Sequence, residues 1–344
     1  MSPKAMIGMS GGVDSSVAAY LVQKAGYQCI GTTMQLHDDA AAQIADAKAV
    51  CDRLGMDFCT MDLQKAFRTH VQAHFVAAYE NGLTPNPCIE CNKHLKFGLF
   101  WEEAQKHGCS HIVTGHYARI EKAEDGYRLK KGLEAQKDQS YFLYGIPRQL
   151  LAHILFPLGS LDKATVRQIA ESQELVTARK KDSQDICFVP DGDYMTFLRS
   201  FTGKTYAPGQ YLDLSGKVVG QHQGAVAYTL GQRKGLGIAL GEPTYVCAKD
   251  MSANTVTVGP NEALFHNELL ATDWNWLSPA PTAPLRCMAK ARSRMTEQPA
   301  TVYSEGFDYR VVFDEPQRAL TPGQAVVLYD GDTVLGGGTI SQII

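Results

Sequence analysis

The chain has 344 residues, which exceeds the usual size of a single domain, so we expect two or three domains. A hydrophobic content of 44% and a charged content of 20% are typical of a soluble globular protein, and no apolar run approaches the roughly 20 residues of a membrane span. The net charge of −3 gives no indication of a wholly basic nucleic-acid-binding protein. Such binding would need a local basic patch.

The first residues and the cysteines indicate a compartment. Residues 1–4 lead directly into a predicted strand and leave no room for a signal peptide. The nine cysteines are an odd number in a chain without a secretory signal, which disfavours a disulfide framework. We therefore expect a protein of the reducing cytoplasm that is not bound to a membrane.

The most informative motif is SGGVDSS, at residues 10–16. It follows an apolar run at 5–9 that predicts a buried strand, and it leads into a predicted helix at 17–23. Gly11 and Gly12 allow a tight turn that points successive N–H groups at an anion. Three serines add hydroxyl donors, and the helix N-terminus adds partial positive charge. A phosphate-binding loop is favoured over a glycine-rich turn that binds nothing.

The loop lacks the Gly-Lys-Ser/Thr that holds the terminal phosphates in P-loop kinases and GTPases. Asp14 stands where such sites use positive charge, which predicts Mg²⁺ as its neutralising partner. N–H groups without that lysine suit the binding of released pyrophosphate. SGGVDSS resembles the signature of the ATP pyrophosphatase (PP-loop) superfamily, whose members adenylate a carbonyl or carboxyl oxygen and release pyrophosphate.

The first half of the chain alternates predicted strands and helices. The expected strands are 29–36, 56–63 and 111–117, and the expected helices are 40–54, 64–79 and 93–106. This alternation predicts an α/β fold: a doubly wound parallel sheet with helices on both faces. Ligands of such sheets bind at the carboxyl ends of the strands, near the point where strand order reverses. The phosphate loop, Met34 and Gly115 all follow predicted strands.

After about residue 200 the predicted segments become short and β-prone. An Asp-Gly pair at 330–331, between apolar runs, indicates a β-hairpin. We predict a nucleotide-binding and catalytic domain at 1–200, a small mixed middle domain at 201–268 and a C-terminal β-barrel that contacts tRNA at 269–344.

Three cysteines have distinctive surroundings. Cys88 and Cys91 lie in TPNPCIECNK, a loop with two prolines that leads into a helix. A helix N-terminus stabilises a thiolate, so the pKa of these thiols is expected to be lowered. Cys187 follows a basic pair at 180–181 that is expected to act similarly. The Cys-x-x-Cys spacing alone leaves zinc, iron–sulfur and redox roles open.

Together with the phosphate loop, these cysteines give a resemblance to the tRNA-specific 2-thiouridylase family, which replaces the 2-oxygen of the wobble uridine with sulfur. The matching segments run from residue 8 to about 338: GMSGGVDSS, Met34, TPNPCIECNKHLKFG, TGHYAR, KDQSYFLYG, KKDSQDICFVPDGDY, GQHQGAVAYTLGQRKGLG, KARSR and LTPGQAVVLYDG.

The resemblance implies that ATP adenylates the 2-oxygen and that a persulfide donor protein or relay supplies the sulfur. It implies that Cys187 carries the persulfide and that Cys91 attacks the persulfide or the sulfurated intermediate, closing a Cys91–Cys187 disulfide that thiol exchange later clears. The implied ATP-binding residues are Gly8, Met9, Ser10, Gly11, Gly12, Val13, Asp14, Ser15, Met34 and Gly115. The implied contacts with the target base are Asn86, Pro87 and Cys88, and those with tRNA are Lys137, Asp138, Gln139, Arg292 and Ser293.

Cys88 departs from the family pattern, because many members carry aspartate there. Three candidate thiolates with an open fourth position describe an iron–sulfur cluster, so Cys88, Cys91 and Cys187 as cluster ligands form the alternative to the persulfide mechanism. Two other functions compete: a different PP-loop ligase acting on a small molecule, and a non-catalytic metal module that binds RNA. The paired cysteines disfavour the first, and the phosphate loop disfavours the second.

Two weaker patterns each allow an ordinary structural role. The alternation of Lys290, Arg292 and Arg294 predicts one face of a strand, either a solvated edge or a phosphate-contacting stripe. His70 and His74 have a metal-compatible spacing, but no acidic third ligand accompanies them, so an ordinary helix face is favoured.

Overall fold

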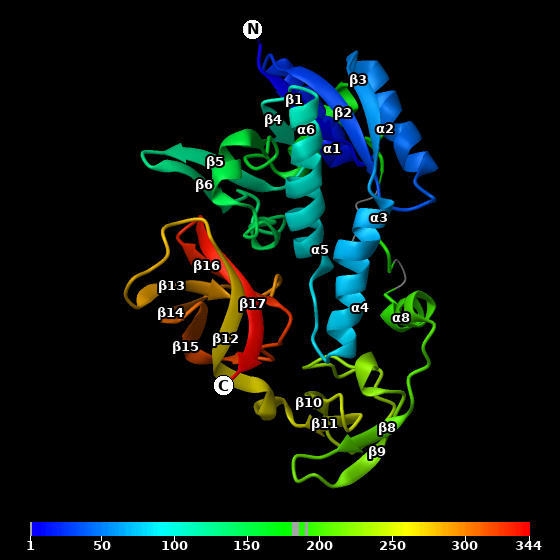
Figure 1. The fold of residues 1–344 in the computed structure, drawn as a ribbon, viewed down its shortest axis with the longest axis vertical. Coiled ribbons are helices and arrows are strands. Elements are labelled where there is room, and N and C mark those ends of the chain that lie inside the picture. Colours follow the sequence, from blue (N-terminus) through cyan, green and yellow to red (C-terminus); the bar gives the residue numbers. More distant parts are fainter. Residues whose placement is uncertain (1, 181–185, 190–191) are drawn as a thin grey trace.

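The computed structural model describes residues 2–180, 186–189 and 192–344. Its first sheet has five parallel strands in the order β3-β2-β1-β4-β7 (Figure 1). These strands are β1 (Lys4–Gly8), β2 (Gln28–Gln35), β3 (Asp57–Asp62), β4 (His111–Val113) and β7 (Ile154–Leu155). Strand order reverses at β1, so its carboxyl end is the switch point where such sheets bind ligands.

Helices cover both faces of this sheet, which confirms the doubly wound α/β prediction. The first face carries α1 (Val13–Lys24), α2 (Ala41–Leu54) and α7 (Lys163–Ser172). The second carries a continuous helical stretch made of α5 (Pro87–Glu90), the π-helix η2 (Cys91–Leu99) and α6 (Phe100–Lys106). Successive residues of β1 point to opposite faces, so Ala5 and Ile7 enter one core and Met6 the other.

A second helical stretch follows β3 and leads away from the sheet. It consists of α3 (Gln64–Phe67), the π-helix η1 (Arg68–Gln72) and α4 (Ala73–Glu80). Helix α8 (Tyr194–Thr202) lies beside α4 in Figure 1, and the two meet where the Phe75 and Phe197 rings are 6.0 Å apart.

The middle of the chain forms a small mixed sheet in the order β10-β11-β8-β9, at the lower end of the molecule in Figure 1. Its strands are β8 (Gly209–Leu212), β9 (Val218–His222), β10 (Tyr245–Asp250) and β11 (Thr255–Gly259). Tyr211, Val246 and Val256 are fully buried in its core. The remaining short helices of the described chain are the 3₁₀ turns Ser140–Phe142, Arg148–His153, Ala225–Ala227 and Asn261–Leu264.

The C-terminal part is a closed six-stranded antiparallel barrel, as predicted. Its strands are β12 (Phe265–Trp276), β13 (Leu285–Lys290), β14 (Gln298–Glu305), β15 (Asp308–Arg318), β16 (Ala325–Asp330) and β17 (Thr333–Ile343). The barrel closes because β12 pairs with both β15 and β17. The predicted hairpin at Asp330-Gly331 joins β16 to β17.

Several local predictions were wrong. Strand β4 ends at Val113 instead of continuing to 117, and the helix expected from 93 begins at Pro87. The hairpin of β5 (Ala118–Ala123) and β6 (Gly126–Lys131) was not predicted, and it extends the barrel sheet through the Thr333–Lys130 pairing. Because β13 ends at Lys290, the residues at 292 and 294 lie beyond it, so the expected stripe on one strand face does not exist.

Among the described residues, none of the helices combines the length and the apolar character that crossing a membrane would require.

Candidate active site

The SGGVDSS segment forms a hydrogen-bonded loop between β1 and α1. The Ser10 N–H donates to Ser15 Oγ at 3.1 Å, and the Ser16 hydroxyl donates to the Gly12 carbonyl at 2.9 Å. Gly11 has a φ of +65°, and a Cβ there would lie 2.8 Å from the Gln43 carbonyl oxygen, so both conformation and space require glycine. The first turn of α1 therefore begins in a loop shaped by its own serines and glycines, and phosphate binding by its N–H groups stays a prediction.

Asp14 already has a cation partner that the sequence did not reveal. Lys163, the first residue of α7, places its Nζ 2.7 Å and 2.8 Å from the two carboxylate oxygens of Asp14. The Tyr117 hydroxyl donates to the same carboxylate at 2.9 Å. The Lys163 side chain is 12% exposed and the Asp14 side chain 33%, so this ion pair is partly shielded from solvent. The cation that neutralises Asp14 thus comes from a residue 149 positions away in sequence.

Two further predicted nucleotide residues lie against the loop. A Cβ on Gly115 would be 2.9 Å from the Asp14 carbonyl carbon and from the Ser15 nitrogen, so the segment after β4 touches the start of α1. A Cβ on Gly8 would be 3.5 Å from the methyl carbon of Met34, at the carboxyl end of β2. The fold therefore brings the loop, Met34 and Gly115 to the same edge of the sheet. Lys180 also reaches this edge, where its Nζ donates to the Gly11 carbonyl at 3.0 Å.

The cysteine pair begins the helical stretch on the other face. Asn86 caps this stretch by accepting a hydrogen bond from the Cys88 N–H at 3.2 Å, and Pro87 occupies the first helical position. A side-chain cap of this kind stabilises a helix by about 1 kcal/mol. Cys88 is exposed, whereas Cys91 is buried one turn later. Asn92 is fixed behind them, because its amide donates to the Phe142 carbonyl at 2.9 Å.

Cys187 is held next to this pair by its neighbour in sequence. The Phe188 ring packs edge-on against Phe67 and Phe75 of the second helical stretch, with ring centroids 5.6 Å and 5.2 Å apart. It also lies 4.8 Å from the Phe197 ring of α8. Cys187 itself is exposed. Aromatic packing therefore anchors the segment while leaving the thiol accessible.

The prediction that these thiols have lowered pKa values was wrong. Surrounding protein atoms desolvate the thiolates and raise the pKa of Cys88 and Cys91 above the usual value of 9.0. Desolvation, together with the nearby Cys91 and Cys88, raises the pKa of Cys187 to about 11. Lys96 acts in the opposite direction on all three. Desolvation outweighs the helix dipole here, and because Cys88 and Cys91 both act on Cys187, the three thiols lie near one another.

The described residues lack a preformed metal site. They contain no group of three or more His, Cys, Asp or Glu side chains arranged to hold a metal ion. His70 stacks on His94 at 4.9 Å, and His94 in turn contacts Glu90, so His70 has an aromatic partner on the neighbouring helix. In the part of the chain that the structure describes, all nine cysteines are free.

Three family models together match almost the whole chain. Residues 3–191 match the tRNA methyl transferase HUP domain, residues 195–260 the tRNA methyl transferase PRC-barrel domain, and residues 266–340 the aminomethyltransferase β-barrel domain. A tRNA-specific 2-thiouridylase MnmA from Clostridioides difficile is 44% identical over 99% of both chains. Another from Symbiobacterium thermophilum is 44% identical, covering 100% of this chain and 93% of its own.

The chain belongs to the tRNA-specific 2-thiouridylase family. Among solved structures, a 4-thiouridine synthetase–RNA complex with bound ATP is similar at 16% identity and a TM-score of 0.37, with 58% of this chain and 50% of that chain covered.

The residues that the family resemblance assigns to tRNA have structural contacts here. Asp138 accepts hydrogen bonds from the Gly132 N–H at 2.9 Å and from the Ser140 hydroxyl at 2.8 Å. The Gln139 side chain accepts from the Tyr117 N–H at 2.9 Å. The loop at 137–139 is therefore fixed beside the sheet edge that carries the SGGVDSS loop, Met34 and Gly115, which we call the nucleotide edge. Its contact with tRNA stays a prediction.

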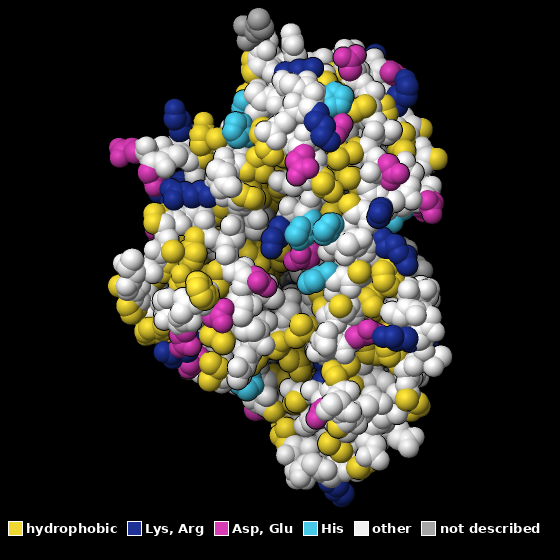
Figure 2. All heavy atoms as spheres, viewed as in Figure 1, with side chains coloured by type: hydrophobic (Ala, Val, Ile, Leu, Met, Phe, Trp, Pro, Cys, Tyr) yellow, Lys and Arg dark blue, Asp and Glu magenta, His cyan; other side chains and the backbone are white. Residues whose placement is uncertain are grey.

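Arg292 links the middle part of the chain to the C-terminal barrel. Its guanidinium donates to the Leu230 carbonyl of the middle part at 3.2 Å and to the Thr321 hydroxyl of the barrel. Desolvation lowers the pKa of Arg292 from its ordinary value. Ser293 is half-buried and Arg294 is exposed. Figure 2 shows basic, acidic and histidine side chains gathered around the middle of one face, without a uniformly basic surface.

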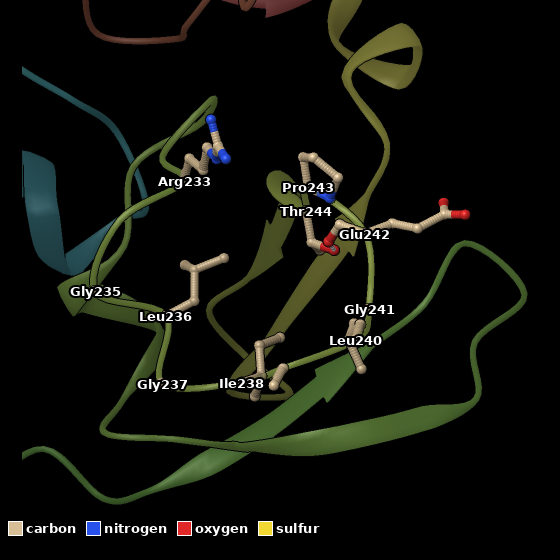
Figure 3. A pocket seen from close by; sticks show the side chains of 11 residues that line it. Arg233, Gly235, Leu236, Gly237, Ile238, Leu240, Gly241, Glu242, Pro243 and Thr244 are labelled. Carbon is tan, nitrogen blue, oxygen red and sulfur yellow. Dashed lines mark hydrogen bonds between the residues drawn. The ribbon is translucent and has the colours of Figure 1, made fainter.

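A pocket of about 460 Å³ lies away from these groups, in the middle part of the chain. It is formed by a single glycine-rich loop, and Figure 3 shows Leu236 and Ile238 pointing into the loop while the Glu242 carboxylate points outward. Arg233 lies at one end of this loop. The pocket includes none of the predicted nucleotide residues or reactive cysteines.

Proposed function

We propose that this protein uses ATP to replace the 2-oxygen of the wobble uridine in tRNA with sulfur. The observation that carries this proposal is the SGGVDSS loop at the carboxyl edge of the sheet, together with three cysteines of which two act on the third, Cys187. The relatives that match nearly the full chain are named for this reaction.

Adenylation uses the phosphate loop. The uridine O2 attacks the α-phosphorus of ATP, an O–P bond forms, and the bond to pyrophosphate breaks. Backbone N–H groups at the start of α1 bind the leaving pyrophosphate, and Lys163 supplies positive charge from α7. Mg²⁺ stays a prediction: Asp14 has the oxygen ligands that this ion prefers, but both oxygens contact Lys163 and would have to be shared.

Sulfur transfer uses the cysteines. A donor protein that carries a cysteine persulfide passes its terminal sulfur to Cys187. That sulfur attacks C2 of the adenylated uridine, a C–S bond forms, and AMP leaves with the former O2. Cys91 then attacks Cys187 Sγ, so that the Cys91–Cys187 disulfide forms and the S–S bond to the uridine sulfur breaks with its electron pair on that sulfur. A cellular thiol reduces the disulfide afterwards.

The target base is proposed to contact Asn86, Pro87 and Cys88, which start the helical stretch that carries Cys91. The tRNA backbone is proposed to contact residues 137–139, Ser293 and Arg292, the last after release of its present partners. The free cysteines of the described chain suit a reducing cytoplasm, which stays our prediction for the location.

The experiment measures two half-reactions with unmodified tRNA. We expect tRNA-dependent exchange of pyrophosphate into ATP, and we expect 2-thiouridine at the wobble position when a persulfide donor is added. Nucleoside mass spectrometry detects the product. Exchange without tRNA would favour a small-molecule ligase. A methylated nucleoside in place of the thiolated one would favour the methyl transfer mentioned in two family-model descriptions.

The iron–sulfur alternative is tested separately. Anaerobic purification followed by iron and sulfide analysis and an absorbance spectrum would reveal a cluster on Cys88, Cys91 and Cys187. We expect none, because the described residues do not group three such side chains in a metal-binding arrangement.

A further inference from the structure

Lys96 occupies an unusual place in the helical stretch that carries the cysteines. It lies in the π-helix Cys91–Leu99, five residues after Cys91. In an α-helix, residues five apart are turned about 140° away from each other. A π-helix bonds residue i to residue i+5, which brings such residues toward the same side. The π-helix therefore places Lys96 on the side of the helix that faces the reactive thiols.

A buried histidine, itself held by Thr114, holds the Lys96 amine there. Its Nζ lies 3.5 Å from His116 Nε2, and Thr114 Oγ1 lies 2.7 Å from His116 Nδ1. His116 is only 9% exposed, and desolvation lowers its pKa well below the usual value of 6.5, so the ring is neutral. For Nε2 to accept from the ammonium, Nδ1 must carry the proton and donate to Thr114. His116 therefore faces Lys96 with a lone pair.

The positive charge of Lys96 is directed at sulfur. In the described residues no carboxylate pairs with Lys96. Lys96 is the cation that lowers the pKa of all three thiols. Cys88 raises the pKa of Cys91, and Cys88 and Cys91 both raise the pKa of Cys187.

We propose that Lys96, held by His116, stabilises the sulfur anion through which sulfur is transferred. This inference rests on the proposed function for its place in the reaction. When Cys91 attacks as a thiolate, and when the persulfide on Cys187 attacks as an anion, the charge forms among groups that burial has already desolvated. A fixed ammonium group lowers the free energy of that anion without becoming a covalent partner, so Lys96 keeps its proton throughout.

The test compares Lys96→Met, Lys96→Arg and a matched control, Lys93→Met, an exposed lysine on the same π-helix. The first measurement is the rate of iodoacetamide alkylation of Cys88 and Cys187 against pH, read by peptide mass spectrometry. Loss of a nearby opposite charge raises a thiol pKa by roughly one unit or more. We expect alkylation about tenfold slower in Lys96→Met at a given pH, with partial rescue in Lys96→Arg and no change in Lys93→Met.

The second measurement separates sulfur transfer from adenylation. We expect Lys96→Met to lower tRNA thiolation at least tenfold while pyrophosphate exchange stays within about threefold of the parent. Thermal melting shows that the variants are folded. Unchanged alkylation, or thiolation and exchange falling in parallel, would overturn the role. If the parent thiolated no tRNA, the proposed function would fail, while the alkylation comparison would still decide whether Lys96 acts on the thiols.

Discussion

The nucleotide edge and the thiol group differ in how their charges are arranged. At the nucleotide edge Asp14 is paired with Lys163, and Lys180 contacts both the Gly11 carbonyl and Asp46. Among the three neighbouring cysteines, Cys88 and Cys187 are exposed residues. Nearby protein atoms still desolvate their thiolates, which raises the pKa of both and keeps the thiols protonated. One region is therefore charged and internally paired before any ligand binds, whereas the other carries its reactive groups in neutral form.

This difference fits the two half-reactions. Pyrophosphate is released from ATP with a charge that is the same in every turnover, so a fixed arrangement of N–H groups and lysine suits it. Sulfur instead moves between several covalent partners. A protonated thiol is a weak nucleophile, so it stays unreactive until a nearby cation and the incoming partner favour the anion. The following predictions test this contrast, beginning with the largest effect.

Replacing either reactive cysteine should abolish sulfur transfer while leaving adenylation intact. We expect Cys91→Ser and Cys187→Ser to lower thiolation by about a thousandfold or more, because one carries sulfur and the other releases it. Pyrophosphate exchange should stay within about threefold. Cys247→Ser, at a half-buried strand cysteine in the middle part, is the control. Substantial thiolation by either serine variant would contradict the persulfide assignment.

Breaking the ion pair between Asp14 and Lys163 should abolish adenylation while leaving tRNA binding intact. We expect Asp14→Ala and Lys163→Met to lower pyrophosphate exchange by about two to three orders of magnitude, since each removes a group from the phosphate site. Binding of tRNA, measured by filter retention, should be nearly unchanged. Lys48→Met removes an exposed ion pair with Asp52 and serves as the control. Exchange at the parent rate in either variant would show that the loop has been misread.

The pH dependence of thiol reactivity should follow burial. Because the pKa of Cys187 is raised to about 11, less thiolate exists at neutral pH than for a free cysteine. Its alkylation rate should therefore rise about tenfold per pH unit from about pH 7 to pH 10. Time courses with iodoacetamide and mass spectrometry measure this rise. If the alkylation rate instead levelled off near pH 7, the Cys187 thiol would have the lowered pKa that the sequence predicted.

The two barrel arginines should behave differently. We expect Arg294→Ala, at an exposed site, to weaken tRNA binding several-fold and to reduce the salt slope by roughly one, as for a single phosphate contact. Arg292→Ala should instead lower the melting temperature, because its guanidinium joins the middle part to the barrel. The control is Arg53→Ala, which removes an exposed arginine of α2 that pairs with Glu174. If the salt dependence of tRNA binding were unchanged in Arg294→Ala, Arg294 would be a solvated side chain that does not contact tRNA.

The smallest effect is expected at Cys88. Cys88→Asp restores the acid that is common in the family, and aerobically prepared enzyme given a persulfide donor should keep at least half of its thiolation activity. A cluster mechanism predicts the opposite, because loss of a ligand would remove nearly all activity. Nucleoside analysis of the product decides between them. Inactive Cys88→Asp, together with iron and sulfide in the anaerobic parent, would overturn the persulfide assignment.

The parts predicted best were those encoded by contiguous residues. The strand, the SGGVDSS loop and the helix follow one another directly, and their glycines and serines specify the turn by conformation and hydrogen bonding. The barrel hairpin at Asp330-Gly331 is equally local. Strand alternation predicted the parallel sheet, although it missed the β5–β6 hairpin, whose pairing with β17 joins segments about 200 residues apart.

The missed residues depend on distant segments. Lys163 and Lys96 are two among the 33 lysines and arginines of the chain. Lys96 lies in a segment that matches the family, but its sequence position does not show which groups its amine contacts. Lys163 becomes important because α7 packs beside α1, and Lys96 because a π-helix turns it toward Cys91. Arg292 shows the reverse case, since a residue assigned to RNA is engaged between parts of the protein.

The sequence alone predicted the SGGVDSS loop and the order of the three structural parts, because these rest on local conformation, and the family resemblance predicted Cys91 and Cys187 as the reactive cysteines. Only the tertiary structure decided which cation neutralises Asp14, which lysine faces the thiols and in which direction the thiol pKa values move. The physical reason is that charge stabilisation and desolvation depend on every group within several ångströms in space, and folding brings those groups from segments far apart in the chain.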